Sequence, residues 1–349
     1  MLRVYKPITH PLFKLHLMVE HLVCEVWCKA DDKDCLTKIQ PDFLIIVNAY
    51  DWLRDAILAI YSECKLLSIP EKESISTAFK VNNKIEELCN GTTKPTAIDK
   101  LPKVVQEKMN PLFIRFYEDL LERAKVPGNK IDYYRELYKQ NRFYFCPCCG
   151  YVPFESNLSH VREAFDHYLP KSIYPFSSVN CENLVPLCYK CNSDRKKEKD
   201  PILGGRRAYY PFQNAATNIK IEITFSDDFI KSLYNIIVLE IAPEPTDKQE
   251  FEIKLTSDMQ DKVDTWNDLF EINERYYDRV NSFTFSFLNM LKRYYRAWKT
   301  MDQTWTFANT VNFYIADFEI DKYLEEKFLK IPFMNGLMRS KEFMEAYLK

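Results

Sequence analysis

The chain has few glycines, and that shortage excludes several classes of protein. Only 6 of its 349 residues are glycine, against 24 Phe, 22 Tyr and 5 Trp. This composition excludes collagen-like, disordered and low-complexity proteins. It favours a helix-rich, well-packed chain with few turns that demand a positive φ. Because a domain usually spans about 100 to 200 residues, two or three compact units are expected.

The sequence also lacks any apolar run close to the roughly 18 residues that a membrane-spanning helix needs. Its first residues, Met1 to Pro7, do not have the charged-then-apolar layout of a secretory signal. We therefore expect a soluble, cytoplasmic protein that does not associate with membranes. The 11 cysteines agree with this expectation, because an odd number of scattered cysteines is typical of free thiols in a reducing compartment.

A strong overall charge is lacking as well. The formal net charge is −2, so the molecule as a whole has no positive field that would attract nucleic acid. Between Pro186 and Tyr210, however, there are seven Lys and Arg residues against three Asp and Glu. Attraction to phosphate would therefore be local, and we expect weak binding of nucleic acid by this chain alone or help from a partner.

Four of the cysteines form two Cys-x-x-Cys pairs, Cys146/Cys149 and Cys188/Cys191. Each such turn can direct two thiolates at one metal ion, and two turns complete the tetrahedral shell of a closed, structural zinc site. Cys148 leaves the choice of ligand open in the first turn. We favour Cys146 and Cys149 because their spacing matches that of the second pair. Free core thiols and a thioredoxin-like redox pair are the alternatives, but a redox motif needs one pair and not two.

An acidic residue and a histidine, Asp166 and His167, lie between the two pairs. The carboxylate is a hard oxygen donor suited to Mg²⁺ or Mn²⁺, whereas a neutral imidazole can take a proton from water. Asn192 offers a second oxygen ligand at the start of an expected helix. Because adjacent residues of a strand point to opposite faces, a local bend is needed for Asp166 and His167 to serve one site.

These residues together resemble a known family. The pattern Asp166-His167-x-x-Pro170, followed by Asn183-Leu184-Val185-Pro186-Leu187-Cys188-x-x-Cys191-Asn192, is similar to that of the HNH endonucleases. Those enzymes share a ββα-metal fold with a zinc-knuckle brace. Asn192 stands where the family name has its final histidine, which makes this the HNN variant. The resemblance covers roughly 55 of the 349 residues.

The resemblance implies a metal-dependent endonuclease that hydrolyses phosphodiester bonds of DNA. In it, His167 would be the general base that activates water. Asp166 and Asn192 would bind the catalytic Mg²⁺ or Mn²⁺, and zinc would be structural. Asn183 would hold the loop that orients His167. Arg195 stands where the family commonly has a lysine, and either cation could contact phosphate.

Cations near this segment are the candidates for nucleic-acid binding. They are Lys171, Arg195, Lys196 and Lys197. The run from Arg195 to Lys199 could equally be a solvated helix face, which is the usual environment of such runs. We favour phosphate contact because the run lies beside the candidate site.

The hydrophobic pattern predicts a predominantly helical α+β fold in three regions. Residues 1–140 are expected to be helical, as scaffold or for partner binding, with one apolar face formed by Tyr50, Leu53, Ile57, Ile60, Tyr61 and Cys64. Residues 141–215 would form the ββα module with its zinc knuckles. Residues 216–349 would hold short antiparallel strands and then helices. The strands are predicted at Ile219–Phe225, Asn235–Ile241 and Phe251–Leu255, and the helices from about Asp261.

Other interpretations stay open. One is a zinc-braced nucleic-acid-binding or adaptor protein with a vestigial nuclease site, although the intact set of Asp166, His167, Asn183 and Asn192 argues against decay. The residues also do not discriminate DNA from RNA as substrate. By analogy with the family alone, the chain resembles nucleases of bacterial anti-phage defence systems, in which an ATPase or sensor partner restrains the nuclease.

Overall fold

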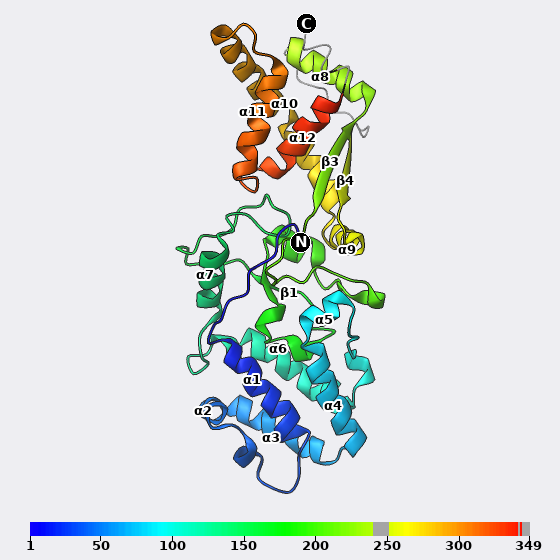
Figure 1. The fold of residues 1–349 in the computed structure, drawn as a ribbon. Helices are drawn as coiled ribbons and strands as arrows, with labels where there is room; N and C mark the ends of the chain where they lie inside the picture. Colours follow the sequence, from blue (N-terminus) through cyan, green and yellow to red (C-terminus); the bar gives the residue numbers. More distant parts are fainter. Residues whose placement is uncertain (240–250, 341–342, 344–349) are drawn as a thin grey trace. The chain divides into compact units, whose positions relative to one another are not determined.

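The computed structural model has an α+β fold dominated by helices, with two small antiparallel sheets (Figure 1). It describes residues 1–239, 251–340 and 343. The chain packs as two compact units, of which the first contains Arg3–Cys148 and Pro153–Ala216 and the second Cys149–Val152 and Thr217–Lys349. A unit boundary therefore follows Ala216, beside the predicted start of the third region. The regions predicted at 1–140 and 141–215 pack together in the first unit.

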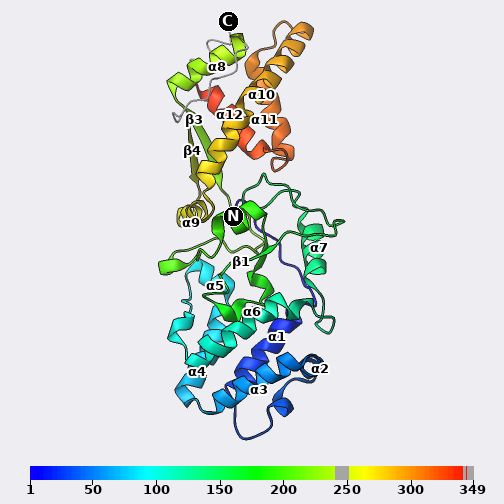
Figure 2. The same cartoon turned by 180° about the vertical axis from the view of Figure 1, so that it is seen from behind.

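Helices make up most of the first unit. The α-helices are α1 (Phe13–His21), α2 (Pro41–Ala49), α3 (Asp51–Lys65), α4 (Ile69–Asn82), α5 (Ile85–Asn90), α6 (Asn110–Glu118) and α7 (Lys130–Asn141). Short 3-10 and π-helical segments lie between them at Leu22–Trp27, Cys35–Lys38, Ile98–Lys100, Val105–Met109 and Leu120–Glu122. In both views α6 lies between α1 and strand β1 (Phe165–His167), as Figures 1 and 2 show.

The helix α3 forms for the reason that the sequence predicts. Its buried residues are Leu53, Ile57, Ile60, Tyr61 and Cys64, which recur at the spacing of one helical face. The next helix, α4, starts at a capping box in which Ser68 and Glu71 satisfy each other's backbone N–H groups. The predicted apolar face is confirmed, with Tyr50 immediately before the helix.

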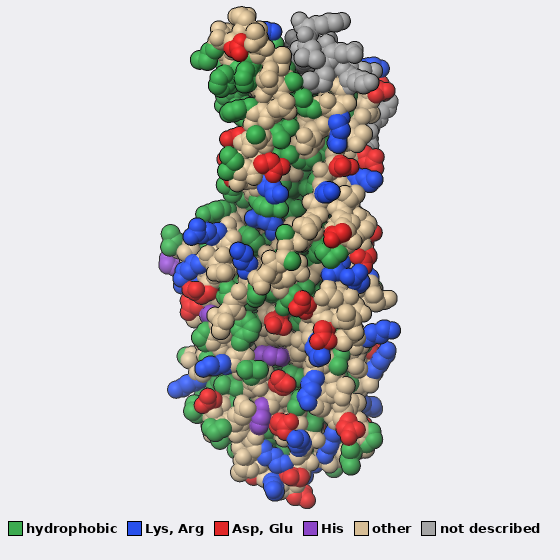
Figure 3. All heavy atoms as spheres, in the orientation of Figure 1, with side chains coloured by type: hydrophobic (Ala, Val, Ile, Leu, Met, Phe, Trp, Pro, Cys, Tyr) green, Lys and Arg blue, Asp and Glu red, His purple; other side chains and the backbone are tan. Residues whose placement is uncertain are grey.

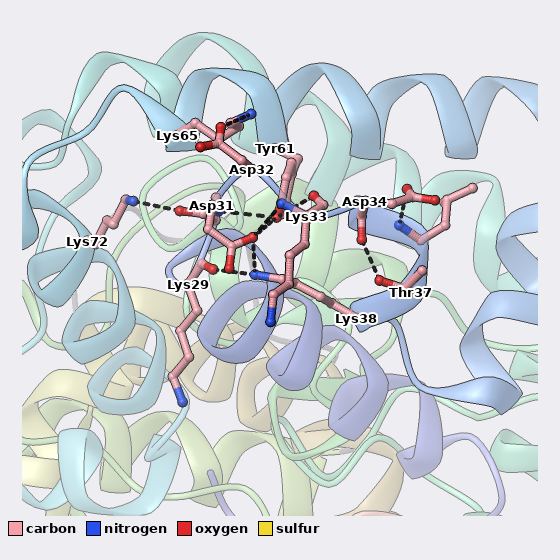
Figure 4. Close-up of polar contacts among 12 residues, drawn as sticks. Lys29, Asp31, Asp32, Lys33, Asp34, Thr37, Lys38, Tyr61, Lys65 and Lys72 are labelled. Carbon is pink, nitrogen blue, oxygen red and sulfur yellow. Dashed lines mark hydrogen bonds and ion pairs between the residues drawn. The ribbon is translucent and has the colours of Figure 1, made fainter.

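A loop of charged residues, 31–38, packs against Tyr61 of α3 (Figure 4). The Asp31 carboxylate accepts hydrogen bonds from the Tyr61 hydroxyl at 3.1 Å and the Lys33 N–H at 2.9 Å, and it lies 2.8 Å from the Lys38 ammonium. The hydrogen bond from Lys38 is the main cause that lowers the pKa of Asp31 to about 2. These charges satisfy one another within the loop, so we assign them a structural role.

The first unit also contains a short two-stranded antiparallel sheet, with short helical segments between its strands and after them. Strand β1 pairs with β2 (Leu184–Pro186), and a π-helical segment follows at Lys190–Lys196. Between the strands lie the 3-10 turns Pro175–Ser177 and Cys181–Asn183, and the turn Leu203–Gly205 comes later. The N-terminal segment crosses this region, because Tyr5 pairs with Phe212 and its hydroxyl donates to the Pro186 carbonyl at 2.8 Å.

The second unit combines a two-stranded antiparallel sheet with helices. Strands β3 (Lys220–Phe225) and β4 (Phe251–Thr256) pair along six residues each. The helices are α8 (Asp227–Leu239), α9 (Gln260–Phe270), α10 (Ile272–Met301), α11 (Phe307–Ile320) and α12 (Lys327–Arg339). Gly336 lies inside α12, where an added Cβ would come within 2.6 Å of the Ile223 carbonyl oxygen. The helix can therefore approach β3 closely only with glycine at this position.

One predicted strand of this unit is wrong. Residues 235–239 of the predicted strand Asn235–Ile241 belong to α8, and residues 240 and 241 lie outside the described part of the chain. The Ser226 hydroxyl accepts a hydrogen bond from the Phe229 N–H at 3.2 Å, and two acidic residues stand in the first helical turn. These are helix-start signals, and they override the β propensity of the apolar run. The strands near 219–225 and 251–255 are confirmed as β3 and β4.

The helices of the described residues are all too short or too polar to cross a lipid bilayer.

We expect the acid stability of the first unit to depend on His16 of α1. Its ring stacks on Phe79 at 5.8 Å, and burial lowers its pKa to about 4, below the ordinary value near 6.5. The folded state therefore favours the neutral ring. Its stabilising contribution is complete above about pH 6.5 and is lost as the pH falls towards 4, by up to about 3 kcal/mol.

Urea unfolding of His16→Leu at about pH 7 and about pH 4 measures this contribution. The loss of unfolding free energy between the two pH values should be smaller in the variant than in the wild type. His160→Leu, at an exposed position, serves as the control and should keep the wild-type difference. If His16→Leu loses as much unfolding free energy between the two pH values as the wild type does, His16 is not the cause of that loss.

Candidate functional site

The structure brings together the four cysteines of the two Cys-x-x-Cys pairs. The sulfurs of Cys146, Cys149, Cys188 and Cys191 all lie within 4.8 Å of one another, and all four residues are buried. The cluster could bind a metal ion such as zinc, for which four thiolates are a usual structural ligand set. Cys148 is buried next to the first pair but is not among the four.

The first turn of this cluster is closed by backbone contacts on both sides. Phe145 pairs with Pro153 across it, and the N-terminal segment adds a hydrogen bond from the Arg3 N–H to the Pro147 carbonyl at 2.9 Å. Gly150 ends the turn with φ +81°, in the left-handed region. An added Cβ there would also lie 2.5 Å from Leu2 Cδ2. Glycine therefore suits this position both for its backbone conformation and for the lack of space for a side chain.

The strands β1 and β2 carry the candidate catalytic residues. In their antiparallel register Asp166 lies opposite Val185, and His167 lies opposite Leu184. Asp166 is 3% exposed and His167 is 9% exposed. Polar groups at this depth need defined partners, so the contacts of both side chains indicate what they can do.

The ring of His167 is held in one orientation. Its Nε2 lies 2.9 Å from the carbonyl oxygen of Ser178. A carbonyl can only accept a hydrogen bond, so Nε2 carries the proton and Nδ1 keeps its lone pair. The Tyr117 ring and the imidazole pack edge to face, with their centroids 4.2 Å apart. Burial lowers the pKa of His167 to about 3, which keeps the ring neutral.

The Ser178 carbonyl is placed by a loop that Asn183 closes. The Asn183 side chain is fully buried, accepts from the Leu169 N–H at 2.7 Å and donates to the Leu169 carbonyl at 2.9 Å. Its amide also donates to the Ser177 hydroxyl at 3.1 Å. The side chain thus ties both ends of the 168–183 loop together beside His167.

Helices from the beginning of the chain support the same loop. The Ser178 hydroxyl donates to the carbonyl of Phe113 in α6 at 2.9 Å. Phe176 packs against Phe113 at 5.3 Å and against Phe79 of α4 at 5.4 Å. No role in the site was predicted for Tyr117, Ser178 or these helices. No local pattern could have identified them, because Tyr117 and His167 are 50 residues apart in the sequence.

Asp166 is paired with a buried cation. The Lys196 ammonium lies 3.1 Å from each of its carboxylate oxygens and donates to the His167 carbonyl at 2.9 Å. The Lys196 side chain is 0% exposed. Burial raises the pKa of Asp166, and Lys196 opposes that change. The pair holds the end of the π-helical segment against β1.

The other candidate residues in and directly after the π-helical segment differ in burial. Asn192 is half-buried in the π-helical segment, and its backbone N–H donates to the Cys188 carbonyl at 2.9 Å. The described contacts include no hydrogen bond from the Asn192 side chain to Asp166 or His167. Lys197 is exposed.

The remaining cations differ in how accessible they are. Lys171 forms an ion pair with Glu118 at 2.6 Å, and Arg195 is half-buried. Lys196 was predicted as a phosphate contact, with a solvated helix face as the alternative. The structure instead buries it beside Asp166, so its ammonium faces the inside of the site and not a surface.

No family model, curated protein or solved structure matches the chain. The resemblance to HNH endonucleases therefore stays a prediction from the sequence.

We expect purified protein to contain about one zinc ion per chain and Cys146→Ser to lose it, because a three-thiolate site binds zinc more weakly. Elemental analysis of the metal content measures this, and a thermal melt should show lower stability in the variant. The matched control is Cys148→Ser, which changes a buried neighbour outside the cluster and should keep its zinc. Loss of zinc in Cys148→Ser with retention in Cys146→Ser would reverse the ligand assignment.

Proposed function

We propose that this chain is a metal-dependent endonuclease of HNH type that hydrolyses phosphodiester bonds of DNA, with His167 as the general base. The observation that carries the proposal is the orientation of His167. Its Nε2 is occupied by the Ser178 carbonyl, which leaves Nδ1 as the basic nitrogen. The neighbouring carboxylate and the four-cysteine cluster support the same function.

In this proposal His167, Ser178 and Asn183 each have one role. Nδ1 of His167 takes a proton from the attacking water, which requires a neutral ring. Burial supplies the neutral ring, but it also disfavours the imidazolium that this step forms. The Ser178 carbonyl stabilises the imidazolium that forms, because Nε2 continues to donate to it. Asn183 keeps that carbonyl in place through its contacts with Leu169 and Ser177.

The donors present fit a hard divalent cation in their chemistry. Oδ2 of Asp166 is buried, and its described partner is the Lys196 ammonium at 3.1 Å, in an ion pair without hydrogen-bond geometry. A metal ion would therefore share this oxygen with Lys196. The side-chain oxygen of Asn192 would be the second protein ligand. A bound Mg²⁺ or Mn²⁺ would supply stabilisation of negative charge on the phosphate and the leaving oxygen. Zinc in the cysteine cluster would be structural.

His167→Ala should lower the cleavage rate by about 10² to 10⁴, the usual contribution of a general base. The assay is plasmid cleavage with added Mg²⁺ or Mn²⁺, using proteins of equal zinc content. His160→Ala is the control, since His160 is exposed and lies outside the site. Equal cleavage by the wild type and His167→Ala would exclude His167 as the base.

A second candidate function is nucleic-acid binding without hydrolysis, as an adaptor protein. The pairing of Asp166 with Lys196 favours it, because the carboxylate is already neutralised within the fold. In that case the wild type would bind DNA or RNA but cut neither with either metal ion. Binding and cleavage measured on both substrates separate the two functions and test the choice of DNA.

A further inference from the structure

Lys196 is buried against Asp166, the carboxylate proposed to bind the metal ion. A fully buried ammonium needs several acceptors to offset its lost hydration. Lys196 has both carboxylate oxygens of Asp166 at 3.1 Å and the His167 carbonyl at 2.9 Å. It therefore places a positive charge against the one carboxylate that the proposed metal site contains.

We infer that the Lys196 ammonium competes with a divalent cation for Asp166 and thereby sets the metal concentration at which the site is occupied. This inference rests on the proposed function. Two cations held by one carboxylate repel each other strongly at such separations. Lysine suits the role because its flexible stem allows the ammonium to leave the carboxylate without a change in the backbone.

The test is Mn²⁺ binding measured without nucleic acid, by the loss of the free Mn²⁺ signal in electron paramagnetic resonance. Lys196→Met should bind Mn²⁺ at least about tenfold more tightly than the wild type, because the repulsion is removed. Lys196→Arg keeps the charge and should bind within about threefold of the wild type. Lys199→Met, at an exposed position nearby, is the control for the loss of a surface charge.

A thermal melt gives a second readout. Lys196→Met leaves the Asp166 charge buried without a partner, so the variant should melt below the wild type without metal and recover when Mn²⁺ is added. If the variant folds only with Mn²⁺, the inference is supported. Unchanged or weaker Mn²⁺ affinity, or a variant that no Mn²⁺ concentration restores, overturns it. Failure of the proposed function would be seen separately, as cleavage that survives His167→Ala.

An independent observation concerns an aromatic face on α10 and α11. Figure 3 shows hydrophobic side chains gathered over these two helices. Trp298 stacks on Trp305 at 5.1 Å and contacts Phe313 at 6.2 Å. Tyr294 packs against Tyr314 at 5.2 Å. Tyr294, Trp298 and Phe313 are 45%, 37% and 48% exposed, which is unusual for adjacent large rings.

Basic residues predominate on α10 beside these rings, whereas the acidic residues Asp302 and Asp317 stand at the two ends of the uncharged stretch that follows. From Leu291 to Met301 the chain has four Lys and Arg residues and no Asp or Glu. Arg293 and Lys299 are exposed, and the Lys299 ammonium donates to the Tyr295 hydroxyl at 2.7 Å. From Gln303 to Ala316 the sequence contains no charged residue. Exposed rings flanked by cations suit a ligand that has flat faces and a negative backbone.

We propose that this face binds single-stranded nucleic acid by stacking bases on Trp298 and Phe313, with phosphates near Arg293 and Lys299. The proposal does not depend on hydrolysis at His167. Each stacked base is worth about 1–3 kcal/mol, or roughly five- to 150-fold in affinity. Binding should also weaken with salt, because phosphate contacts release counterions.

Fluorescence anisotropy of a labelled oligothymidine, without added divalent cation, tests the proposal. Phe313→Ala and Trp298→Ala should each weaken binding about tenfold, whereas Leu66→Ala, at an 84% exposed site in the first unit, should not. Circular dichroism confirms that each variant is folded, and Phe313→Ser provides a second change at the half-exposed ring. Wild-type affinity in the folded variants overturns the proposal. So does a loss of self-association with unchanged oligothymidine binding, which would assign the face to a second copy of the chain.

Discussion

The closure of the loop between β1 and β2 is the constraint on which the site depends. A buried amide that satisfies three loop groups is costly to remove, since each partner would be left without a hydrogen bond. Asn183 is such a group, and it fixes the Ser178 carbonyl that selects the tautomer of His167. The packing of Phe176 on α4 and α6 then makes the N-terminal helices part of the same support.

The cysteine cluster and the buried ion pair both hold the short segment that contains Cys191 and Lys196. Cys188 precedes the π-helical segment Lys190–Lys196, Cys191 lies in its first turn, and Lys196 ends it against Asp166. A metal held by the four sulfurs would therefore also fix the direction in which Asn192 and Lys196 leave the cluster. Structural metal binding and the electrostatics of the candidate site are linked through seven residues of backbone.

Local patterns predicted the parts of this protein that depend on short spacing. The apolar face of α3 and the Cys-x-x-Cys pairs were identified because each is a repeat within one turn or one helix. The run from Asn235 was assigned to a strand because a short apolar stretch has no period of its own. The cap at Ser226, outside that run, makes the stretch helical.

The sequence by itself determined which groups are present: four thiols in two pairs, and a carboxylate beside an imidazole. Only the tertiary structure decided their environments. The contacts that hold His167, from Ser178 and Tyr117, come from residues 11 and 50 positions away. Lys196 was predicted to contact phosphate as one of a run of cations, yet it is buried against Asp166. Burial depends on which segments meet in space, and the spacing of charges within one segment does not contain that information.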